Sequence, residues 1–327
     1  MPAGTRNGTG VLAPSPIFRK GLAGDTHGAE WPANAFCQAF GIAPVGLRTG
    51  WEENEGKARN VSRRRMHGKQ GVLRDVAYNE NSGLPCFERE IAMPKKPFDE
   101  YAEKYDSWFL KNRNVLQSEV LLLKHFLKHP GKSLSVGCGS GLFESLLRTE
   151  HGIDIRYGVE PSEGMAAIAG KRGMIVQSGV AEDLPFDNAS FDTVLLNGTP
   201  SYIDDLEKAF REAFRVLKPG GQILVADVPA ESSYGMMYQL AKSADSWEEP
   251  NLKKIAPDHP YPVEFTKAAN WRTTEEKVDV LVRIGFVAME FAQTLTRHPK
   301  FSDNLVEEPV SGFDRGDYVA IRARKPE

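Results

Sequence analysis

The most informative stretch of the sequence is Leu134-Ser135-Val136-Gly137-Cys138-Gly139-Ser140-Gly141-Leu142-Phe143-Glu144, a short apolar run that leads into glycines at alternate positions. The run predicts a buried strand, followed by a turn and an amphipathic helix. The glycines remove side chains that would block a ligand from the turn, and they permit its unusual backbone dihedrals. We therefore expect a flat or charged cofactor to lie directly on this backbone.

The spacing of these glycines distinguishes between two types of cofactor-binding loop. A phosphate-binding Rossmann loop would carry its third glycine one position later, where this chain has Leu142. Dinucleotide binding is therefore disfavoured. The general pattern of strands and helices still permits an NAD(P)-dependent oxidoreductase as an alternative.

Strands and helices alternate after the glycine-rich stretch, which is typical of parallel βαβ units. The predicted strands are Ser133–Val136, Ile153–Glu160, Met174–Gln177, Phe191–Asn197, Gln222–Val228, Phe286–Leu295 and Asp317–Ala323. The pattern predicts an α/β fold with a doubly wound, mostly parallel sheet of seven strands.

The clearest helix runs from Leu206 to Leu217, where apolar residues recur at helical spacing on one face. Lys218-Pro219-Gly220-Gly221 is expected to stop that helix, because proline cannot extend it and glycine accepts the left-handed conformation that closes a helix end. Further helices are predicted over residues 98–109, 116–127 and 273–284, the last opened by a capping-box pair, Thr273 and Glu276.

Residues 229–272 form an insertion after the fifth strand of the predicted sheet. They are rich in Tyr, Trp, Pro and charged residues and have no strand-like period, and only Tyr234–Ala241 has a helical pattern. Long irregular insertions in compact domains are usually functional. We therefore expect a lid over the carboxyl edge of the sheet.

Residues 1–93 differ from the rest of the chain. They are rich in Gly, Asn, Arg and Pro, lack a sustained period, and hold more basic than acidic residues, whereas residues 94–327 are acidic. We predict a poorly ordered N-terminal extension, followed by one catalytic domain over residues 94–327. We also expect translation of the natural product to start at Met93.

The composition limits the class of protein. The chain has 327 residues, no signal-peptide pattern and no apolar run near the ~20 residues of a membrane span, so a cytoplasmic protein is expected. Cys37, Cys86 and Cys138 are widely spaced, which argues against a disulfide framework and a metal site. A net charge of -3 argues against nucleic acid as a partner and favours a small molecule.

Four motifs together resemble the class I S-adenosylmethionine-dependent methyltransferases, in particular the small-molecule group that includes the ubiquinone/menaquinone-type enzymes. The resemblance covers residues 98–325. Its motifs are the glycines at 137, 139 and 141, Glu160 at the end of the second strand, the loop 181–186 with Ser190-Phe191-Asp192, and Leu217-Lys218-Pro219-Gly220-Gly221. It implies S-adenosylmethionine as cofactor and a Rossmann-like methyltransferase fold.

The resemblance also implies roles for individual residues. The glycines would bind the methionine and ribose parts of the cofactor, Glu160 the two ribose hydroxyls, and the loop from Ala181 and Glu182 the adenine. Two positions depart from the family pattern. Ser135 stands where an acidic residue is usual, and Val180 stands where an Asp often contacts the adenine amino group. Other groups would then have to supply those contacts, with Glu182 or the backbone near it on the adenine side.

The chemistry of Glu160 can be argued without the family, because a carboxylate accepts two hydrogen bonds at once and a ribose offers two adjacent hydroxyls. Cys138 lies inside the glycine motif and could suggest a nucleophile. No His is placed nearby in the sequence to activate its thiol, so we reject that hypothesis.

Methyl transfer needs mainly an acceptor that is positioned in line and shielded from water, with a general base only where the acceptor must lose a proton. Candidate catalytic residues are Tyr105, Tyr202 and His259, and the wider set that could touch the acceptor or cofactor adds Tyr101, Asn197, Tyr261 and Glu264. The acceptor atom, whether O, N, C or S, is left open. A non-catalytic domain that binds S-adenosylmethionine is a further alternative.

Overall fold

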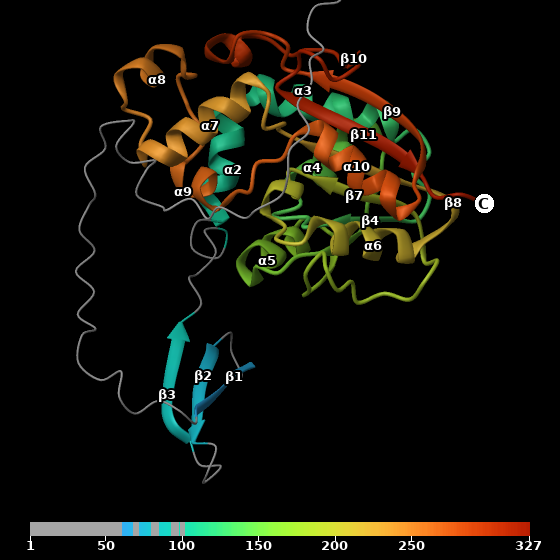
Figure 1. Cartoon of the computed structure of the whole chain (residues 1–327). Coiled ribbons are helices and arrows are strands. Elements are labelled where there is room, and N and C mark those ends of the chain that lie inside the picture. Colours follow the sequence, from blue (N-terminus) through green and yellow to red (C-terminus); the bar gives the residue numbers. More distant parts are fainter. Residues whose placement is uncertain (1–60, 68–71, 80–84, 93–97, 99–101) are drawn as a thin grey trace, which may run out of the picture. The chain divides into compact units, whose positions relative to one another are not determined.

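The computed structural model describes residues 61–67, 72–79, 85–92, 98 and 102–327 (Figure 1). The chain divides into two compact units. One comprises residues 1–68 and 73–90, and the other comprises residues 69–72 and 91–327.

A three-stranded sheet in the order β1-β2-β3, formed by Val61–His67, Val72–Asn79 and Pro85–Ala92, belongs mostly to the first unit. Strands β1 and β2 are antiparallel. The sequence did not predict these strands, because charged residues interrupt each of them and no alternation of apolar and polar residues marks them. Residues 1–60 lie outside the described residues. Poor order of the extension and a start at Met93 stay predictions.

The second unit is built on an eight-stranded sheet in the order β10-β9-β11-β8-β7-β4-β5-β6. The strands are β4 Ser133–Val136, β5 Tyr157–Val159, β6 Ile175–Gln177, β7 Phe191–Asn197, β8 Leu217–Asp227, β9 Val287–Thr294, β10 Val310–Ser311 and β11 Tyr318–Arg324. Strands β4 to β8 pair in parallel, whereas β11 pairs antiparallel with both β8 and β9, and β10 pairs antiparallel with β9. The predicted doubly wound α/β fold is confirmed, with one correction to the number of strands. The additional strand, β10, has two residues and is too short to show a period.

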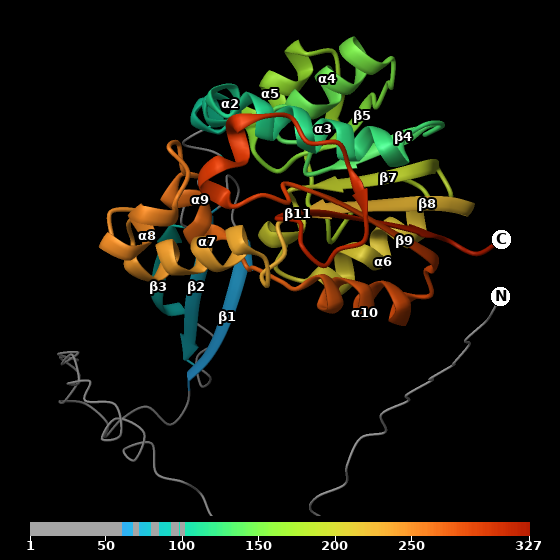
Figure 2. The same cartoon turned by 90° about the horizontal axis from the view of Figure 1, so that it is seen from above.

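Helices cover both faces of this sheet. The helices are α2 Ala102–Lys111, α3 Arg113–Phe126, α4 Leu142–His151, α5 Glu163–Lys171, α6 Leu206–Val216 and α10 Thr274–Ile284. Figure 2 shows α3 and α4 on one side of the strands and α6 and α10 on the other. Strand β7 serves both cores, because Leu195 packs with the α3 and α4 cluster while its neighbours Val194 and Leu196 pack with the α6 and α10 cluster.

Local sequence explains the helix ends. The predicted capping box is present at the start of α10, where the Thr273 hydroxyl accepts from the Glu276 backbone N–H and the Glu276 carboxylate accepts from the Thr273 N–H. Helix α6 ends at Val216, close to the predicted Leu217. The segment Lys218-Pro219-Gly220-Gly221 follows it but lies within β8, which begins directly after the helix at Leu217.

The insertion after β8 is helical, so the prediction of an irregular segment was wrong. It contains α7 Ser233–Ala244, α8 Pro250–Ile255 and α9 Val263–Ala268. Helix α7 extends the predicted Tyr234–Ala241, whereas α8 and α9 have six residues each, too few to show a helical period. In the described part of the chain, no helix is both long enough and apolar enough to cross a membrane.

Candidate active site

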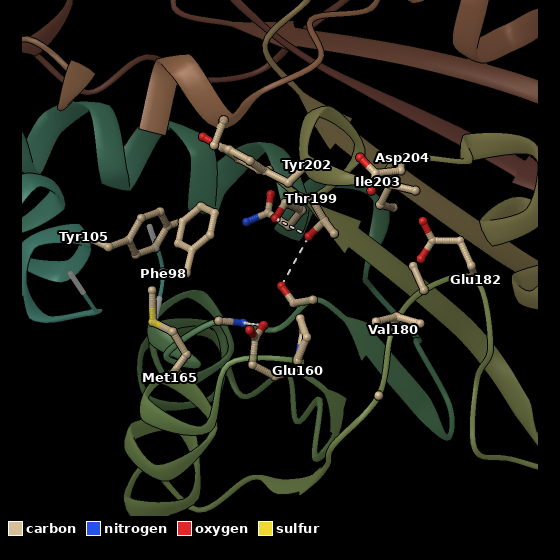
Figure 3. A pocket seen from close by; sticks show the side chains of 18 residues that line it. Phe98, Tyr105, Glu160, Met165, Val180, Glu182, Thr199, Tyr202, Ile203 and Asp204 are labelled. Atoms are coloured by element: carbon tan, nitrogen blue, oxygen red, sulfur yellow. Dashed lines mark hydrogen bonds between the residues drawn. The ribbon is translucent and has the colours of Figure 1, made fainter. Parts of the chain in front are cut away.

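A cavity of about 180 Å³ lies where the parallel strands end. Gly137 follows β4, Glu160 follows β5 and Asn197 ends β7, and all three line the cavity (Figure 3). This position agrees with the rule that open α/β sheets bind ligands at the carboxyl ends of their strands.

The structure brings together nearly all of the residues that the sequence predicted for the cofactor. Those that line the cavity are Tyr105, Gly137, Gly139, Glu160, Ala181, Glu182 and Asn197. Gly141 is the exception. It precedes α4 with φ +69°, and a Cβ built on it would lie 2.7 Å from the Met174 Sδ. Gly141 is therefore required for the packing around the start of α4 rather than for open space in the cavity.

The two glycines that line the cavity have different surroundings. A Cβ on Gly137 would lie 2.5 Å from the Thr199 Cγ2, so the Thr199 side chain fills the space beside that glycine. A Cβ on Gly139 would meet no atom within 4 Å. Gly139, with φ +53°, therefore leaves a cradle at the turn that a side chain would occupy.

Glu160 forms the floor of the cavity beside this turn (Figure 3). Its side chain is buried, with 6% of the residue exposed. Its Oε2 accepts from the Gly139 backbone N–H at 2.9 Å, and its Oε1 accepts from the Ser162 backbone N–H at 2.9 Å. These bonds fix the carboxylate against the glycine turn. A carboxylate oxygen can accept more than one hydrogen bond, so the Glu160 carboxylate is chemically suited to the hydroxyls of a ribose.

A buried carboxyl lies behind the glycine turn at the position where Ser135 departs from the family pattern. The Ser135 hydroxyl donates to the Glu144 Oε1 at 2.6 Å, and both residues are buried. Burial raises the pKa of Glu144, while the Ser135 hydrogen bond lowers it. An acidic group of α4 thus lies next to the serine that stands at this position of β4.

An ion pair ties α2 to the glycine turn and to the end of α5. The Arg172 Nη2 donates to the Asp106 Oδ2 at 2.7 Å, and the Arg172 Nη1 donates to the Ser140 carbonyl at 2.8 Å. The Ser140 hydroxyl donates to the Asp106 Oδ1 at 2.5 Å. Both carboxylate oxygens of Asp106 therefore have donors, and α2 is fixed over the turn.

One end of the cavity is partly apolar and carries two carboxylates. Val180 and Ile203 lie on this side with Glu182 and Asp204, across Glu160 from Phe98 and Tyr105 (Figure 3). The Glu182 Oε1 accepts from the Asp205 backbone N–H at 3.3 Å. A flat ring could pack against the apolar side chains here while the polar groups contact its edge.

The opposite end is aromatic and leads to a second chamber. Phe98 packs against Tyr105 and Tyr202, with ring centroids 5.9 Å and 4.7 Å apart. A chamber of about 50 Å³ shares Tyr105, Tyr202 and Gly198 with the larger cavity. Its remaining wall includes Trp108, Tyr238, Tyr261, Trp271 and Tyr318.

Two carboxyl groups, Glu119 of α3 and Asp227 of β8, also line the chamber. The Asp227 carboxylate lies 3.2 Å from the Lys277 Nζ and accepts from the Ser201 hydroxyl at 2.7 Å. Glu119 is 4% exposed, and burial raises its pKa, with the charge of Asp227 adding to the effect.

The structure places some of the residues predicted to touch the acceptor in the chamber and others outside both cavities. Tyr105, Tyr202 and Tyr261 line the chamber, and the hydroxyls of Tyr202 and Tyr261 lie 3.1 Å apart. His259 is exposed and lines neither cavity, and its carbonyl accepts from the Trp108 Nε1 at 2.9 Å. Its place as a candidate base is therefore withdrawn.

The other two predicted acceptor contacts are not part of the site either. The Glu264 carboxylate pairs with the Lys104 Nζ at 2.8 Å and lines neither cavity. Tyr101 lies outside the described residues.

Sequence reasoning missed several residues of the site, notably Thr199, Ile203, Met165, Asp227 and Glu119. For Glu119 a signal existed, because it stands three residues after Leu116 and four before Leu123, on the apolar stripe of its helix. A charged residue on such a stripe indicates a buried polar site.

Two further observations concern possible metal ligands and the Cys138 thiol. No group of three or more His, Cys, Asp or Glu side chains among them could hold a metal ion. Cys138 is buried, and burial raises the pKa of its thiol far above the ordinary value. It is therefore a thiol near neutral pH, which argues against a nucleophilic role.

Comparisons with known proteins agree with this geometry. Residues 134–225 match a family model described as a methyltransferase domain. A solved structure from Thermotoga maritima, described as an S-adenosylmethionine-dependent methyltransferase and possible histamine N-methyltransferase, is 35% identical with a TM-score of 0.60, over 70% of this chain and 98% of that one.

Two curated relatives have no described function. An uncharacterized protein of Methanocaldococcus jannaschii is 33% identical over 228 residues, 70% of this chain and 98% of that protein. One of Mycobacterium tuberculosis is 26% identical over 68% of this chain and 71% of that protein. The ubiquinone/menaquinone-type subgroup stays a prediction. The sheet order, the glycine turn and these matches lead to one conclusion: the chain belongs to the class I S-adenosylmethionine-dependent methyltransferases.

Proposed function

We propose that this methyltransferase acts on a small molecule, which it holds in the aromatic chamber while the cofactor lies in the larger cavity. The observation that carries the proposal is that Tyr105, Gly198 and Tyr202 line both spaces. The shared wall marks the place where a methyl group could pass from one ligand to the other in line.

The residues of the larger cavity fit S-adenosylmethionine along its length. Glu160 would accept hydrogen bonds from the ribose hydroxyls, and the adenine would lie against Val180 and Ile203. The methionine part would follow the backbone at Gly137 and Gly139, where a side chain is absent. This arrangement would direct the sulfonium towards Tyr105.

The protein's contribution to the reaction is positioning and exclusion of water. The cofactor's sulfonium supplies an electrophilic methyl carbon. Burial raises the pKa of Tyr105, Tyr202 and Tyr238, and it raises that of Tyr261 as well. These phenols are therefore neutral near pH 7, so they can donate hydrogen bonds and form apolar walls but cannot act as bases.

The size of the chamber supports a small-molecule acceptor. It is lined by residues of α2, α3, β8, β11 and the insertion, and its volume is about 50 Å³. The relatives in the comparisons include the Thermotoga maritima protein described above and an ajmaline N-methyltransferase of Rauvolfia serpentina, 27% identical over 49% of this chain and 61% of that protein. Both descriptions name N-methyltransferases.

Thermal unfolding in the presence of candidate cofactors tests the proposal first. S-adenosylmethionine and S-adenosylhomocysteine should raise the melting temperature, because a ligand at 100 times its Kd stabilises the folded state by about 2.7 kcal/mol. NAD(H) and NADP(H) should have no effect. The reverse pattern would restore the oxidoreductase alternative. Formation of S-adenosylhomocysteine with a small-molecule panel would then exclude a non-catalytic binding domain.

Replacement of Glu160 tests its proposed contact with the ribose. Glu160→Ala should weaken S-adenosylhomocysteine binding by roughly 1.5–3 kcal/mol, the scale of hydrogen bonds to a charged group. Glu163→Ala is the matched control, because it removes the same charge from an exposed position at the start of α5. Calorimetry that gives equal affinities for the two variants would remove Glu160 from the site.

A further inference from the structure

Glu119 is the least compensated acidic group of the chamber. It belongs to α3, its residue is 4% exposed, and it lines the space between the aromatic walls. Among the described residues, no side chain or backbone group hydrogen-bonds to its carboxyl, whereas Asp106, Glu144 and Glu160 each have such a bond. A buried carboxylate is costly unless it is paired or hydrogen-bonded. Such a group indicates a ligand that completes it.

Asp227 does not need that ligand. Its carboxylate pairs with the Lys277 Nζ at 3.2 Å and accepts from the Ser201 hydroxyl and the Val228 backbone N–H. Lys277 is itself 2% exposed, so the pair is closed off from solvent. The chamber therefore holds one balanced ion pair and one further carboxyl group.

The walls around this carboxyl group are aromatic. The Tyr238 ring lies 5.0 Å from that of Trp271 and 5.6 Å from that of Tyr261, and Trp108 lies 5.0 Å from Tyr261. Aromatic ring faces attract cations, and desolvated sites show the largest effect. An anion would meet the ring faces and Glu119 together and would be repelled.

The volume of the chamber limits the group that fits. A space of about 50 Å³ is several times what one water molecule needs, so an ammonium group with one or two carbons can enter. A larger molecule would extend past Tyr105 and Tyr202 into the cofactor cavity. The reacting end of an acceptor would then lie at the wall that both spaces share.

We infer that the chamber binds the ammonium group of an amine, with Glu119 as its counter-ion, and that the methyl acceptor is therefore a small cationic amine. This inference rests on the proposed function, since it assumes that the chamber is the acceptor site. Glu119 is a substrate-binding residue in this account, and the surrounding rings select a cation over a neutral group of the same shape.

Binding to the full chain loaded with S-adenosylhomocysteine tests the inference. The probes are 2-phenylethylamine and histamine, with 2-phenylethanol as the uncharged analogue, titrated by calorimetry at neutral pH. We expect at least one amine to bind at least ten times more tightly than 2-phenylethanol. Glu119→Gln should reduce that amine's affinity at least ten-fold and leave the affinity for 2-phenylethanol unchanged. Binding of neither amine, or equal binding to wild type and Glu119→Gln, would overturn the inference.

Matched variants separate recognition from folding. Glu307→Gln changes another nearly buried glutamate, 8% exposed, that lines neither cavity, and it should leave amine affinity unchanged. Tyr238→Leu should weaken amine binding, whereas Tyr238→Phe should keep it, because the phenylalanine retains the aromatic face. Equal amine affinities for Tyr238→Leu and Tyr238→Phe would contradict a role of the aromatic ring faces in binding the cation.

The failure of this inference can be told apart from the failure of the proposed function. Binding of S-adenosylhomocysteine to every variant with no amine response overturns the inference alone. If the wild-type chain does not bind S-adenosylhomocysteine, the proposed function is overturned instead.

Discussion

Gly139 and Gly152 have nearly the same backbone conformation in different surroundings. Their φ angles are +53° and +69°, and a Cβ built on either would meet no atom within 4 Å. Gly139 lines the candidate cofactor cavity, whereas Gly152 ends α4 and lies outside it. Substitutions at these two glycines therefore separate the loss of stability caused by a strained backbone from the loss of cofactor affinity caused by an obstructed cavity.

Gly139→Ala should reduce affinity for S-adenosylhomocysteine more than ten-fold, because the methyl group would project into the space proposed for the cofactor. Gly152→Ala should leave that affinity unchanged. Both variants should lose about 1–2 kcal/mol of unfolding free energy, the cost of a left-handed conformation for a residue with a side chain. Calorimetry and urea denaturation measure the two effects. Equal affinities for Gly139→Ala and wild type would place the cofactor elsewhere.

At the scale of single residues, the sequence could predict those residues whose role follows from their spacing along the chain. Gly139 and Glu160 belong to the end of one strand each, one βαβ step apart, and both line the cavity. Gly141 shares the same spacing but serves helix packing, which depends on Met174 from a segment 33 positions later. His259 could be named only as a candidate base, because the sequence could not show that its side chain is exposed.

At the scale of elements, the Ser135–Glu144 hydrogen bond joins β4 to α4 beneath the glycine turn. Ser135 is 1% exposed and Glu144 is 4% exposed, so the bond is shielded from solvent. The family pattern would place an acid at residue 135, next to Glu144. Two buried carboxylates at this distance would repel each other.

A double-mutant cycle tests whether a second acid at residue 135 is incompatible with the buried Glu144. Ser135→Asp should destabilise the fold by roughly 2–4 kcal/mol, since it adds an uncompensated buried carboxyl group. Ser135→Asp combined with Glu144→Gln should recover much of that loss, because the Gln amide can donate to the new Asp. Urea denaturation of the four proteins gives the coupling energy. A double variant as unstable as the sum of the single effects would contradict the account.

Asp317, directly before β11, places a carboxyl group with a raised pKa against the N-terminus of α7. The Asp317 Oδ1 accepts from the Tyr234 backbone N–H at 2.9 Å. Burial raises the pKa of Asp317 from 3.8 to about 6, against the effect of its hydrogen bonds. In the folded state Asp317 therefore holds its proton at pH values where the unfolded chain has lost it.

This displacement predicts a pH dependence of stability. Between pH 4 and pH 6 the folded state binds more protons at Asp317, so unfolding free energy should fall as pH rises and level off above pH 6. The contribution is roughly 3 kcal/mol over the full window. Asp317→Asn should lack it, and the difference between wild type and this variant across pH 4–7 is the quantity to measure. Parallel pH profiles for the two proteins would show that Asp317 does not titrate there.

Elements with a clear period could be predicted, and those without one could not. The bounds of β4 and β7 agree with the sequence prediction, and α6 differs by one residue. Helices α8 and α9 and strand β10 were missed, because segments of two to six residues do not complete enough turns or alternations to show a pattern. Their positions depend on tertiary contacts, such as the buried Leu252 and Phe265.

At the scale of the whole molecule, the parallel strands and the insertion define the two cavities together. The cofactor cavity could be located from the sequence, because the carboxyl ends of parallel strands lie at one edge of a sheet. The aromatic chamber could not. Its walls come from α2, α3, β8, the insertion and β11, which are spread over residues 102–324, and no local pattern shows that they meet.

A crystal structure of the chain with S-adenosylhomocysteine tests the central claim most directly. The account predicts that both ribose hydroxyls lie within hydrogen-bond distance of the Glu160 carboxylate, with the adenine beside Val180 and Ile203 and the sulfur facing Tyr105. A nucleoside bound at any other place would contradict it. So would a turn at Gly139 that packs against neighbouring residues and leaves no room for the cofactor.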